Sequence, residues 1–192
     1  MTNAANAAFS SSLFKRDFSM REKAAFVFLL FTLAIQTTFG QKNEQHFLKN
    51  GISFSYPEKW QIISDESIPD VGNYVSVERT GKSATGLFTL VWMDTEENTG
   101  KTILAQMESM KNANLYRNPG IEFTVVENSI FVGSECKEVN YVTIVKDLKI
   151  EGTIWCFNCS GKTIIVFYQS GIDDKKNNEE GFGLIKQTFA CR

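Results

Sequence analysis

The stretch Gly51-Ile52-Ser53-Phe54-Ser55-Tyr56-Pro57-Glu58-Lys59-Trp60 alternates apolar and polar side chains over its first six positions. A period of two is typical of a half-buried β-strand, because successive side chains point to opposite faces of a sheet. Pro57 cannot donate a ladder hydrogen bond, so it ends the strand. The next residues, 58–63, are interpreted as a turn that enters a second short strand. The stretch therefore predicts two strands joined by a tight turn.

The β pattern recurs along the rest of the chain. β-Branched and aromatic runs joined by short turns predict further strands over residues 74–79, 86–93, 122–127, 129–132, 136–145, 149–158 and 163–170. Residues 41–49, which precede the opening strand, are expected to form a polar lead-in without regular structure.

Two segments have helical periodicity instead. Thr99 is expected to cap a helix whose apolar stripe packs into the core: Ile103, Leu104, Met107 and Met110. A final helix is predicted from about Glu179, and it should bury Phe182, Ile185 and Phe189. Consecutive strands joined by short turns pair antiparallel, and helices then cover the faces of the sheet. The predicted fold class is therefore α+β.

The first 40 residues have the layout of a secretory signal. Two basic residues in Met20–Lys23 precede a short apolar stretch, Ala24–Ile35, and small residues precede a cleavage site between Gly40 and Gln41. A membrane-spanning helix needs about 20 apolar residues, which this stretch lacks. No cysteine stands at the cleavage site, so we expect no lipid anchor. Residues 1–19 are either a genuine extension or the product of an upstream start codon.

Cleavage after residue 40 leaves 152 of the 192 residues, a normal size for a single domain over 41–192. The leader holds 4 of the 20 basic and 2 of the 22 acidic residues, so the remainder carries a net charge of −4. Its basic residues are scattered rather than gathered in a stripe, which argues against nucleic-acid binding. The expected location is the periplasm or the exterior of the cell.

The common catalytic and nucleotide-binding motifs are incomplete. Three Gly-Lys-Ser/Thr triplets lack the upstream glycine of a phosphate-binding loop: 81–83, 100–102 and 161–163. His46 is the only histidine, and it lies in the expected lead-in, away from any predicted nucleophile. Neither a hydrolase triad nor a histidine-rich metal site is expected, and no cofactor is implied.

Four cysteines lie in the C-terminal half of the chain: Cys136, Cys156, Cys159 and Cys191. In an exported protein an even number favours disulfides, and four cysteines allow three pairings. A hairpin turn near Asp147-Leu148 would place Cys136 opposite Cys159 and leave Cys156 to pair with Cys191. Cys156 and Cys159 also form a Cys-x-x-Cys motif. Strands flank it rather than the helix start that activates such thiols, so a redox enzyme is the weaker interpretation.

The strand stopped by Pro57 and followed by Trp60 resembles the start of the PsbP/Mog1-like domains. The later order of elements is similar too, with paired strands, one amphipathic helix near Thr99, a long β-meander and a closing helix with an aromatic end at Thr188-Phe189. The resemblance covers most of residues 47–192. It implies an α/β/α sandwich with a central antiparallel sheet, in a superfamily whose members mostly bind partners and share no catalytic motif.

The leading hypothesis is therefore an exported, non-catalytic binding or envelope-accessory domain that contacts a protein partner, without a stable membrane anchor. The first alternative is an envelope thiol-disulfide enzyme that works through Cys156 and Cys159. The second alternative is a binder of small hydrophobic ligands, which would show an apolar pocket near Met107 and Met110.

Overall fold

The computed structural model describes residues 43–69, 72–116 and 120–192. The predicted signal peptide, its cleavage site between Gly40 and Gln41 and the segment 1–19 lie outside these ranges. The strands are β1 (Glu44–Lys49), β2 (Ile52–Pro57), β3 (Trp60–Ile68), β4 (Gly72–Arg79), β5 (Leu87–Met93), β6 (Ile121–Phe123), β7 (Glu127–Phe131), β8 (Ser134–Val145), β9 (Leu148–Cys159), β10 (Lys162–Gly171) and β11 (Ala190–Cys191). The helices are α3 (Thr99–Asn112) and α4 (Lys175–Thr188), with short 3₁₀ turns η2 (Asn114–Tyr116) and η3 (Ile172–Asp174).

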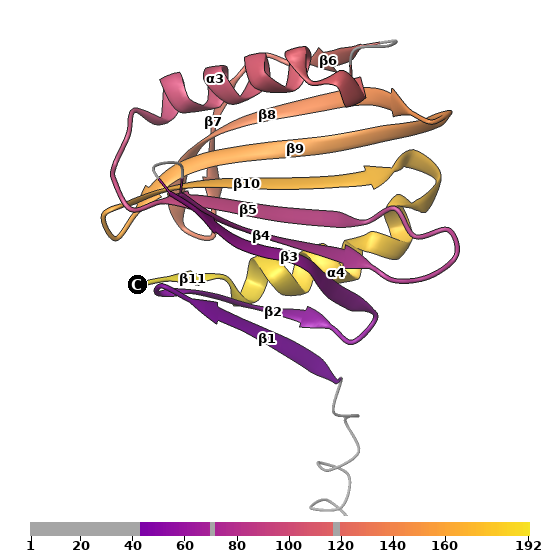
Figure 1. The fold of residues 1–192 in the computed structure, drawn as a ribbon, viewed down its shortest axis with the longest axis horizontal. Coiled ribbons are helices and arrows are strands. Elements are labelled where there is room, and N and C mark those ends of the chain that lie inside the picture. Colours follow the sequence, from indigo (N-terminus) through magenta and orange to yellow (C-terminus); the bar gives the residue numbers. More distant parts are fainter. Residues whose placement is uncertain (1–42, 70–71, 117–119) are drawn as a thin grey trace, which may run out of the picture. The chain divides into compact units, whose positions relative to one another are not determined.

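Within the described ranges the strands form two antiparallel sheets (Figure 1). The small sheet has the order β1-β2-β11, and the large sheet has the order β3-β4-β5-β10-β9-β8-β6. Strand β7 also pairs with β8, next to the stretch of β8 that pairs with β6. The predicted α+β class with antiparallel sheets is thus confirmed.

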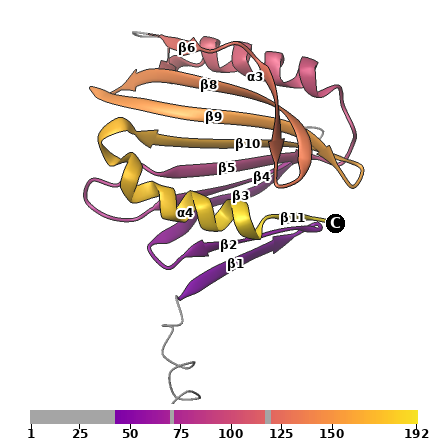
Figure 2. The same ribbon diagram turned by 180° about the vertical axis from the view of Figure 1, so that it is seen from behind.

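Side chains alternate between two separate cores along the central strands. On β9, Ile154 and Cys156 join one cluster, whereas Trp155 and Phe157 join the other. Helix α3 packs against the first cluster through its buried residues Ile103 and Met110. Helix α4 and strand β2 pack into the second cluster, and Figure 2 shows α4 lying beside β11 and β2.

Trp60, the last residue of the opening stretch, fixes the position of α4. Its indole is buried and packs against the ring of Phe182 with centroids 5.1 Å apart. Gly181 lies against the same indole, and a Cβ at this position would overlap the ring. The glycine therefore lets the helix approach the tryptophan closely.

The N-terminal segment differs from the expectation. Residues 44–49 were expected in a polar lead-in, but they form β1 and pair with β2 along their whole length. Phe47 is buried and stacks on Phe54 with ring centroids 5.0 Å apart. The strand forms because β2 offers a free edge and an apolar face, a tertiary effect that the polar sequence of the segment does not reveal.

The predicted helices are present, with corrected ends. Asn98 caps α3, because its Oδ1 accepts a hydrogen bond from the backbone N–H of Lys101 at 3.0 Å, so the assignment of Thr99 was wrong. Leu104 was also wrongly placed in the core. It is 56% exposed, since it lies about 100° around the helix from the buried Ile103.

Helix α4 begins at Lys175, four residues before the predicted start. Phe182 and Ile185 are buried in it as predicted. Phe189 is buried too, but it follows the last helical residue, Thr188.

Candidate functional site

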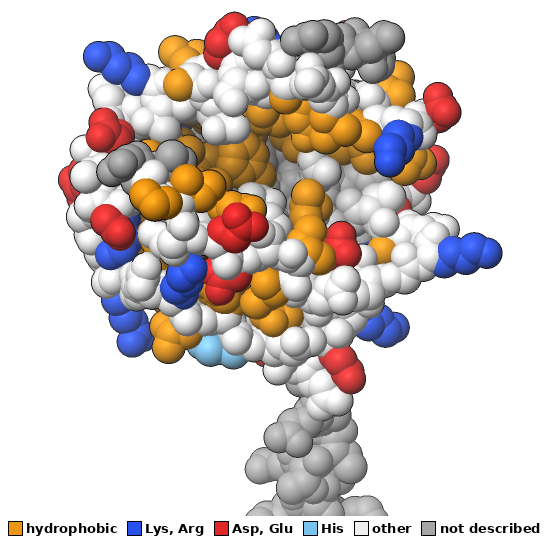
Figure 3. Space-filling model, viewed as in Figure 1, with side chains coloured by type: hydrophobic (Ala, Val, Ile, Leu, Met, Phe, Trp, Pro, Cys, Tyr) orange, Lys and Arg blue, Asp and Glu red, His pale blue; other side chains and the backbone are white. Residues whose placement is uncertain are grey.

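Helix α3 covers only part of one face of the large sheet. It contacts β8, β9 and β6, and Figure 1 shows β10, β5, β4 and β3 extending beyond it. Figure 3 shows hydrophobic side chains around a hollow below the helix on this face. A cavity of about 350 Å³ lies between α3 and the sheet, and its lining is Leu87, Thr89, Val91, Gln106, Ser109, Met110, Ala113, Tyr116, Tyr141, Phe167 and Gln169.

The register of β5 and β10 builds the floor of this cavity. Leu87, Thr89 and Val91 occupy alternate positions of β5, so their side chains share one face of the sheet. Gln169 lies opposite Leu87, and Phe167 lies opposite Thr89. Strand periodicity alone therefore brings these five side chains to the same surface.

Gly152 on β9 makes room for a hydrogen bond across the sheet. It pairs with Tyr141 of β8 on one side and with Gln169 of β10 on the other. A Cβ at Gly152 would overlap the ring of Tyr141, so that ring lies over the glycine. The Tyr141 hydroxyl donates to Oε1 of Gln169 at 3.1 Å. Burial, aided by the neighbouring Tyr116, raises the pKa of Tyr141, so this phenol remains a neutral donor.

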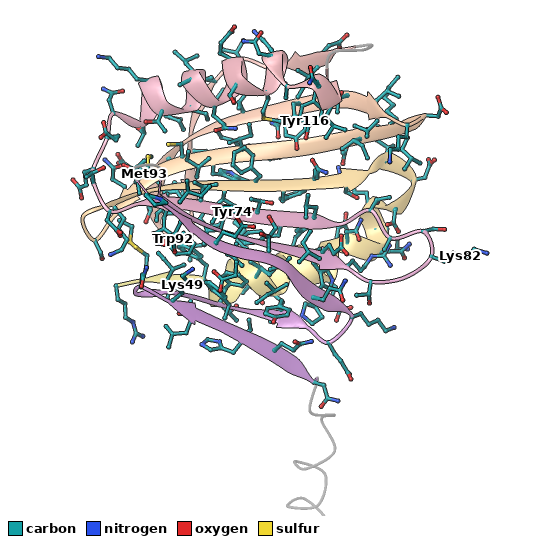
Figure 4. The ribbon with its side chains drawn as sticks, in the orientation of Figure 1. Lys49, Tyr74, Lys82, Trp92, Met93 and Tyr116 are labelled. Carbon is teal, nitrogen blue, oxygen red and sulfur yellow. A yellow bond between two sulfur atoms is a disulfide. The ribbon has the colours of Figure 1, made fainter. Side chains whose placement is uncertain are left out.

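Several polar groups on the cavity wall have no hydrogen-bond partner among the described residues. They include the amide NH₂ of Gln169, whose oxygen is held by Tyr141, the hydroxyl of Tyr116, and the side chains of Gln106 and Ser109. Figure 4 places Tyr116 near the C-terminal end of α3, and burial raises its pKa. Gln106 and Ser109 add further uncharged polar side chains from the helix. At neutral pH the lining therefore carries no charge.

Beyond the cavity, toward the edge strand β3, most side chains on the same face are polar. Ser76 lies opposite Thr89, and their hydroxyls are 2.8 Å apart in a hydrogen bond. Tyr74 lies opposite Val91, and its hydroxyl accepts a hydrogen bond from Ser64 at 2.9 Å. Figure 4 shows Tyr74 on this part of the sheet, which the helix leaves open.

Two carboxylates complete this polar rim. Glu78 lies opposite Leu87 and accepts a hydrogen bond from Gln61 at 3.1 Å. Glu66 lies opposite Tyr74, and hydrogen bonds with Ser64 and Tyr74 lower its pKa. Neither carboxylate forms an ion pair with another residue in the described part of the chain. The face thus combines an uncharged cavity with a polar, acidic rim.

Solved structures with a similar course of the chain identify the fold. The cyanobacterial PsbP (CyanoP) of Synechocystis aligns over 81% of this chain and 96% of its own, with 12% identity and a TM-score of 0.55. The chain has the PsbP/Mog1-like fold. A Bacteroides thetaiotaomicron protein aligns over 77% of this chain and 48% of its own, with 12% identity and a TM-score of 0.51.

The Ran-binding protein Mog1p of Saccharomyces cerevisiae aligns over 79% of this chain and 96% of its own, with 6% identity and a TM-score of 0.48. No protein-family model and no curated protein matches the sequence. At such low identities the likeness shows the fold alone. The likeness therefore assigns no role to any residue of this chain.

The predicted cysteine pairing was wrong. Cys159 is bonded to Cys191 with their Cα atoms 6.2 Å apart, and Cys136 and Cys156 are free and buried. The hairpin turn lies at Lys146-Asp147, one residue earlier than expected, which shifts every partner by two residues. Cys156 therefore lies opposite Lys137, and Cys159 lies beyond the β8–β9 ladder.

The free cysteines belong to the two separate cores, Cys136 with Phe131 and Cys156 with Ile103. They lie on opposite faces of the large sheet and do not bond to each other. Burial, together with the nearby Cys136, raises the pKa of Cys156 to about 12. The Cys156–Cys159 motif is thus not assembled as a redox pair.

Sequence patterns indicated only a small part of the candidate site. An apolar pocket had been considered near Met107 and Met110; Met110 lines the cavity, whereas Met107 is half-buried against the core cluster that contains Met110. The contributions of Tyr141 and Gln169 were missed. The available signal was Gly152, since a glycine inside a strand pattern marks a close approach by another group.

In the described ranges, no three His, Cys, Asp or Glu side chains are grouped so as to hold a metal ion. The same ranges contain no helix of the length and apolarity needed to cross a bilayer.

Proposed function

We propose that residues 41–192 form an exported, non-catalytic binding or envelope-accessory domain that contacts a protein partner through the open face of its large sheet. The proposal treats the fold as an α/β/α sandwich, with α3 and α4 as its outer layers. The signal-like sequence before Gln41 supports export. The Cys159–Cys191 disulfide agrees with an oxidising compartment outside the cytoplasm.

The observation that carries the proposal is the composition of the open face. Specific protein interfaces combine an uncharged, partly aromatic centre with a polar rim. Here Tyr116, Tyr141 and Phe167 line the central cavity. The rim is made of polar side chains on neighbouring strands, including Tyr74 and Glu78. A partner laid across β5, β4 and β3 would cover both zones.

The placement of the reactive side chains supports a role without catalysis. His46 is exposed on β1, and its Nδ1 faces the Ser55 hydroxyl at 3.4 Å. The thiol-disulfide alternative needs an accessible thiol of low pKa. Cys156 has the opposite properties, since it is buried and its pKa is raised. We therefore disfavour this alternative.

The small-ligand alternative has one observation in its favour, which is the cavity beside Met110. Its volume lies near the lower end of the range of about 300–1,000 Å³ that is usual for ligand pockets. Such pockets enclose most of their ligand, whereas this cavity is open to the adjoining face of the sheet (Figure 3). A protein that inserts one side chain into the cavity and also covers the rim would contact more of this face than a small ligand would.

Site-specific photo-crosslinking in the native envelope tests the proposal. A photoreactive side chain replaces Gln106, which lines the cavity, or Leu104, which is 56% exposed on the outer side of the same helix. We expect a discrete protein adduct at position 106 and none at position 104. Equal adducts at both positions, or an adduct at 104 alone, would contradict the proposal.

A further inference from the structure

We infer that the cavity beside α3 accepts a tyrosine side chain of the partner protein, and that this tyrosine is flanked by a basic residue. The inference rests on the proposed function, because it names the chemistry that the same face recognises. It follows from the charge, size and unused hydrogen-bonding groups of the site.

The absence of charge on the cavity wall selects a neutral occupant. Burying an ammonium or carboxylate group without a partner is costly, and the lining residues offer no countercharge. Apolar and aromatic side chains surround the space, among them Val91, Phe167 and Tyr141. An aromatic side chain fits a cavity of about 350 Å³ and contributes a large apolar area on burial.

Hydrogen bonding favours tyrosine over phenylalanine. The Gln169 amide NH₂ is a donor without a partner among the described residues, because Tyr141 occupies only the amide oxygen. The Tyr116 hydroxyl is similarly unused within that part of the chain. A phenol oxygen that enters the cavity can accept from Gln169 and exchange a hydrogen bond with Tyr116. A phenylalanine would leave both groups unsatisfied.

The acidic rim adds the requirement for a basic neighbour. Glu78 lies directly opposite Leu87, a cavity residue, on a strand that is about 4.8 Å away. Glu66 lies opposite Tyr74, which lies opposite the cavity residue Val91, so Glu66 is two strand spacings, about 9.6 Å, from the cavity. An extended partner advances about 3.3 Å per residue, so a basic side chain one or two residues from the tyrosine reaches these carboxylates. Arginine and tyrosine are also enriched among the residues that dominate protein interfaces.

Short blocked peptides test this chemistry directly on the folded domain. The probe is Gly-Arg-Tyr-Arg-Gly, and its relatives replace Tyr with Phe, Tyr with Ala, or both Arg with Glu. Binding is followed by chemical shifts of the domain at low salt. We expect saturable shifts at Gln169 and Tyr116 with the probe, about fivefold weaker binding with Phe, and no measurable binding with Ala. The Glu peptide should bind more weakly than the probe.

Matched variants of the domain show which of its residues cause these differences in peptide binding. Gln169→Leu should abolish the preference for Tyr over Phe, and Glu78→Gln should reduce the salt dependence of probe binding. A cooperative urea transition shows that each variant is folded; its midpoint should be unchanged for Glu78→Gln and lower for Gln169→Leu, because the buried Tyr141 hydroxyl loses its acceptor. Equal binding of the Tyr and Ala peptides would overturn the inference. So would equally tight binding of free N-acetyl-tyrosinamide, because the site would then recognise a small molecule rather than a protein segment.

The same experiments separate this inference from the proposed function. If no peptide binds but the side chain at position 106 still crosslinks to a protein, only the inference of a tyrosine on the partner is contradicted. If the crosslink also fails, the open face itself is not the binding surface.

Discussion

The Tyr141 hydroxyl of β8 donates a hydrogen bond to Gln169 of β10 across the intervening strand β9. The contact is possible because Gly152, which pairs with both residues, has no side chain in the way. The oxygen of the Gln169 amide is thereby held, and its NH₂ group, beside the cavity, has no partner among the described residues. The backbone of a central strand thus determines which hydrogen-bonding group the open face presents.

We predict that Gly152→Ala disturbs this arrangement. The new methyl group overlaps the Tyr141 ring, and overpacking of this kind costs about 1–3 kcal/mol. Urea unfolding measures the loss of stability. Gly183→Ala is the control, because a Cβ there meets open space in α4, and the helix should gain up to about 1 kcal/mol. Equal stability of Gly152→Ala and the wild type would show that Tyr141 does not need the glycine.

A second prediction concerns the number of free thiols. Denatured, unreduced protein should contain the two free thiols of Cys136 and Cys156, and reduction should release those of Cys159 and Cys191 as well. Peptide mapping should recover one crosslink, between Cys159 and Cys191. A sample without free thiols before reduction would refute the assignment.

Loss of the same bond should destabilise the domain. It closes a loop with a sequence separation of 32 residues, so the double variant Cys159→Ser/Cys191→Ser should lose about 3–4 kcal/mol. The comparison is oxidised wild type against the double variant in urea, with reduced wild type as the control. The reduced protein and the variant should unfold at similar urea concentrations. A variant as stable as the oxidised protein would contradict this prediction.

The lowered pKa of Asp174 should make the stability of the domain depend on pH. Burial raises the pKa of its carboxyl, but hydrogen bonds from Asn177, Thr85 and Arg79 outweigh burial and hold the pKa well below its ordinary value of 3.8. The unfolded chain therefore takes up this proton first as the pH falls. The contribution of Asp174 to stability is complete at neutral pH and decreases as the pH drops below about 4.

Asp174→Asn should accordingly cost about 2–4 kcal/mol at pH 7 and about 1 kcal/mol less at pH 3, where the unfolded carboxyl is mostly protonated and the native one is still ionised. Urea unfolding at both pH values measures the difference from wild type. Asp173→Asn, at an exposed neighbouring carboxyl, is the control and should change little at either pH. A cost for Asp174→Asn that is the same at pH 7 and pH 3 would contradict the predicted linkage.

A charge placed in the cavity should block the partner without unfolding the domain. Gln106→Lys introduces an ammonium group among uncharged side chains and repels a basic partner, so we expect at least about tenfold weaker binding of the crosslinked partner. Leu104→Lys places the same charge on the exposed side of α3 and should bind normally. Affinity measured with purified partner provides the test. Equal weakening by both variants would point to a contact with the outside of the helix.

Local patterns in the sequence predicted the α+β class, most strands and both helices, because period-two and helical periodicities depend only on neighbouring residues. Two features depended on contacts distant in the chain. Strand β1 forms on the free edge of β2, and Cys159 meets Cys191 only when β11 pairs with β2. A turn displaced by one residue was enough to give the wrong cysteine partners.

The candidate site was less predictable than the fold. Met110 was noticed because helical spacing marks it, but Tyr141 and Gln169 belong to different strands whose register decides whether they meet. Register is set by the turn geometry and by the pattern of buried side chains over the whole sheet. A single sequence contains this information only indirectly.

Binding of the partner to the open face beside α3 is tested by residue-resolved chemical-shift mapping of the folded domain with the purified partner. We predict the largest changes at Thr89, Gln169 and Tyr116 and little change at Lys186 on α4. Changes confined to α4 and β1, with the cavity residues unaffected, would contradict it.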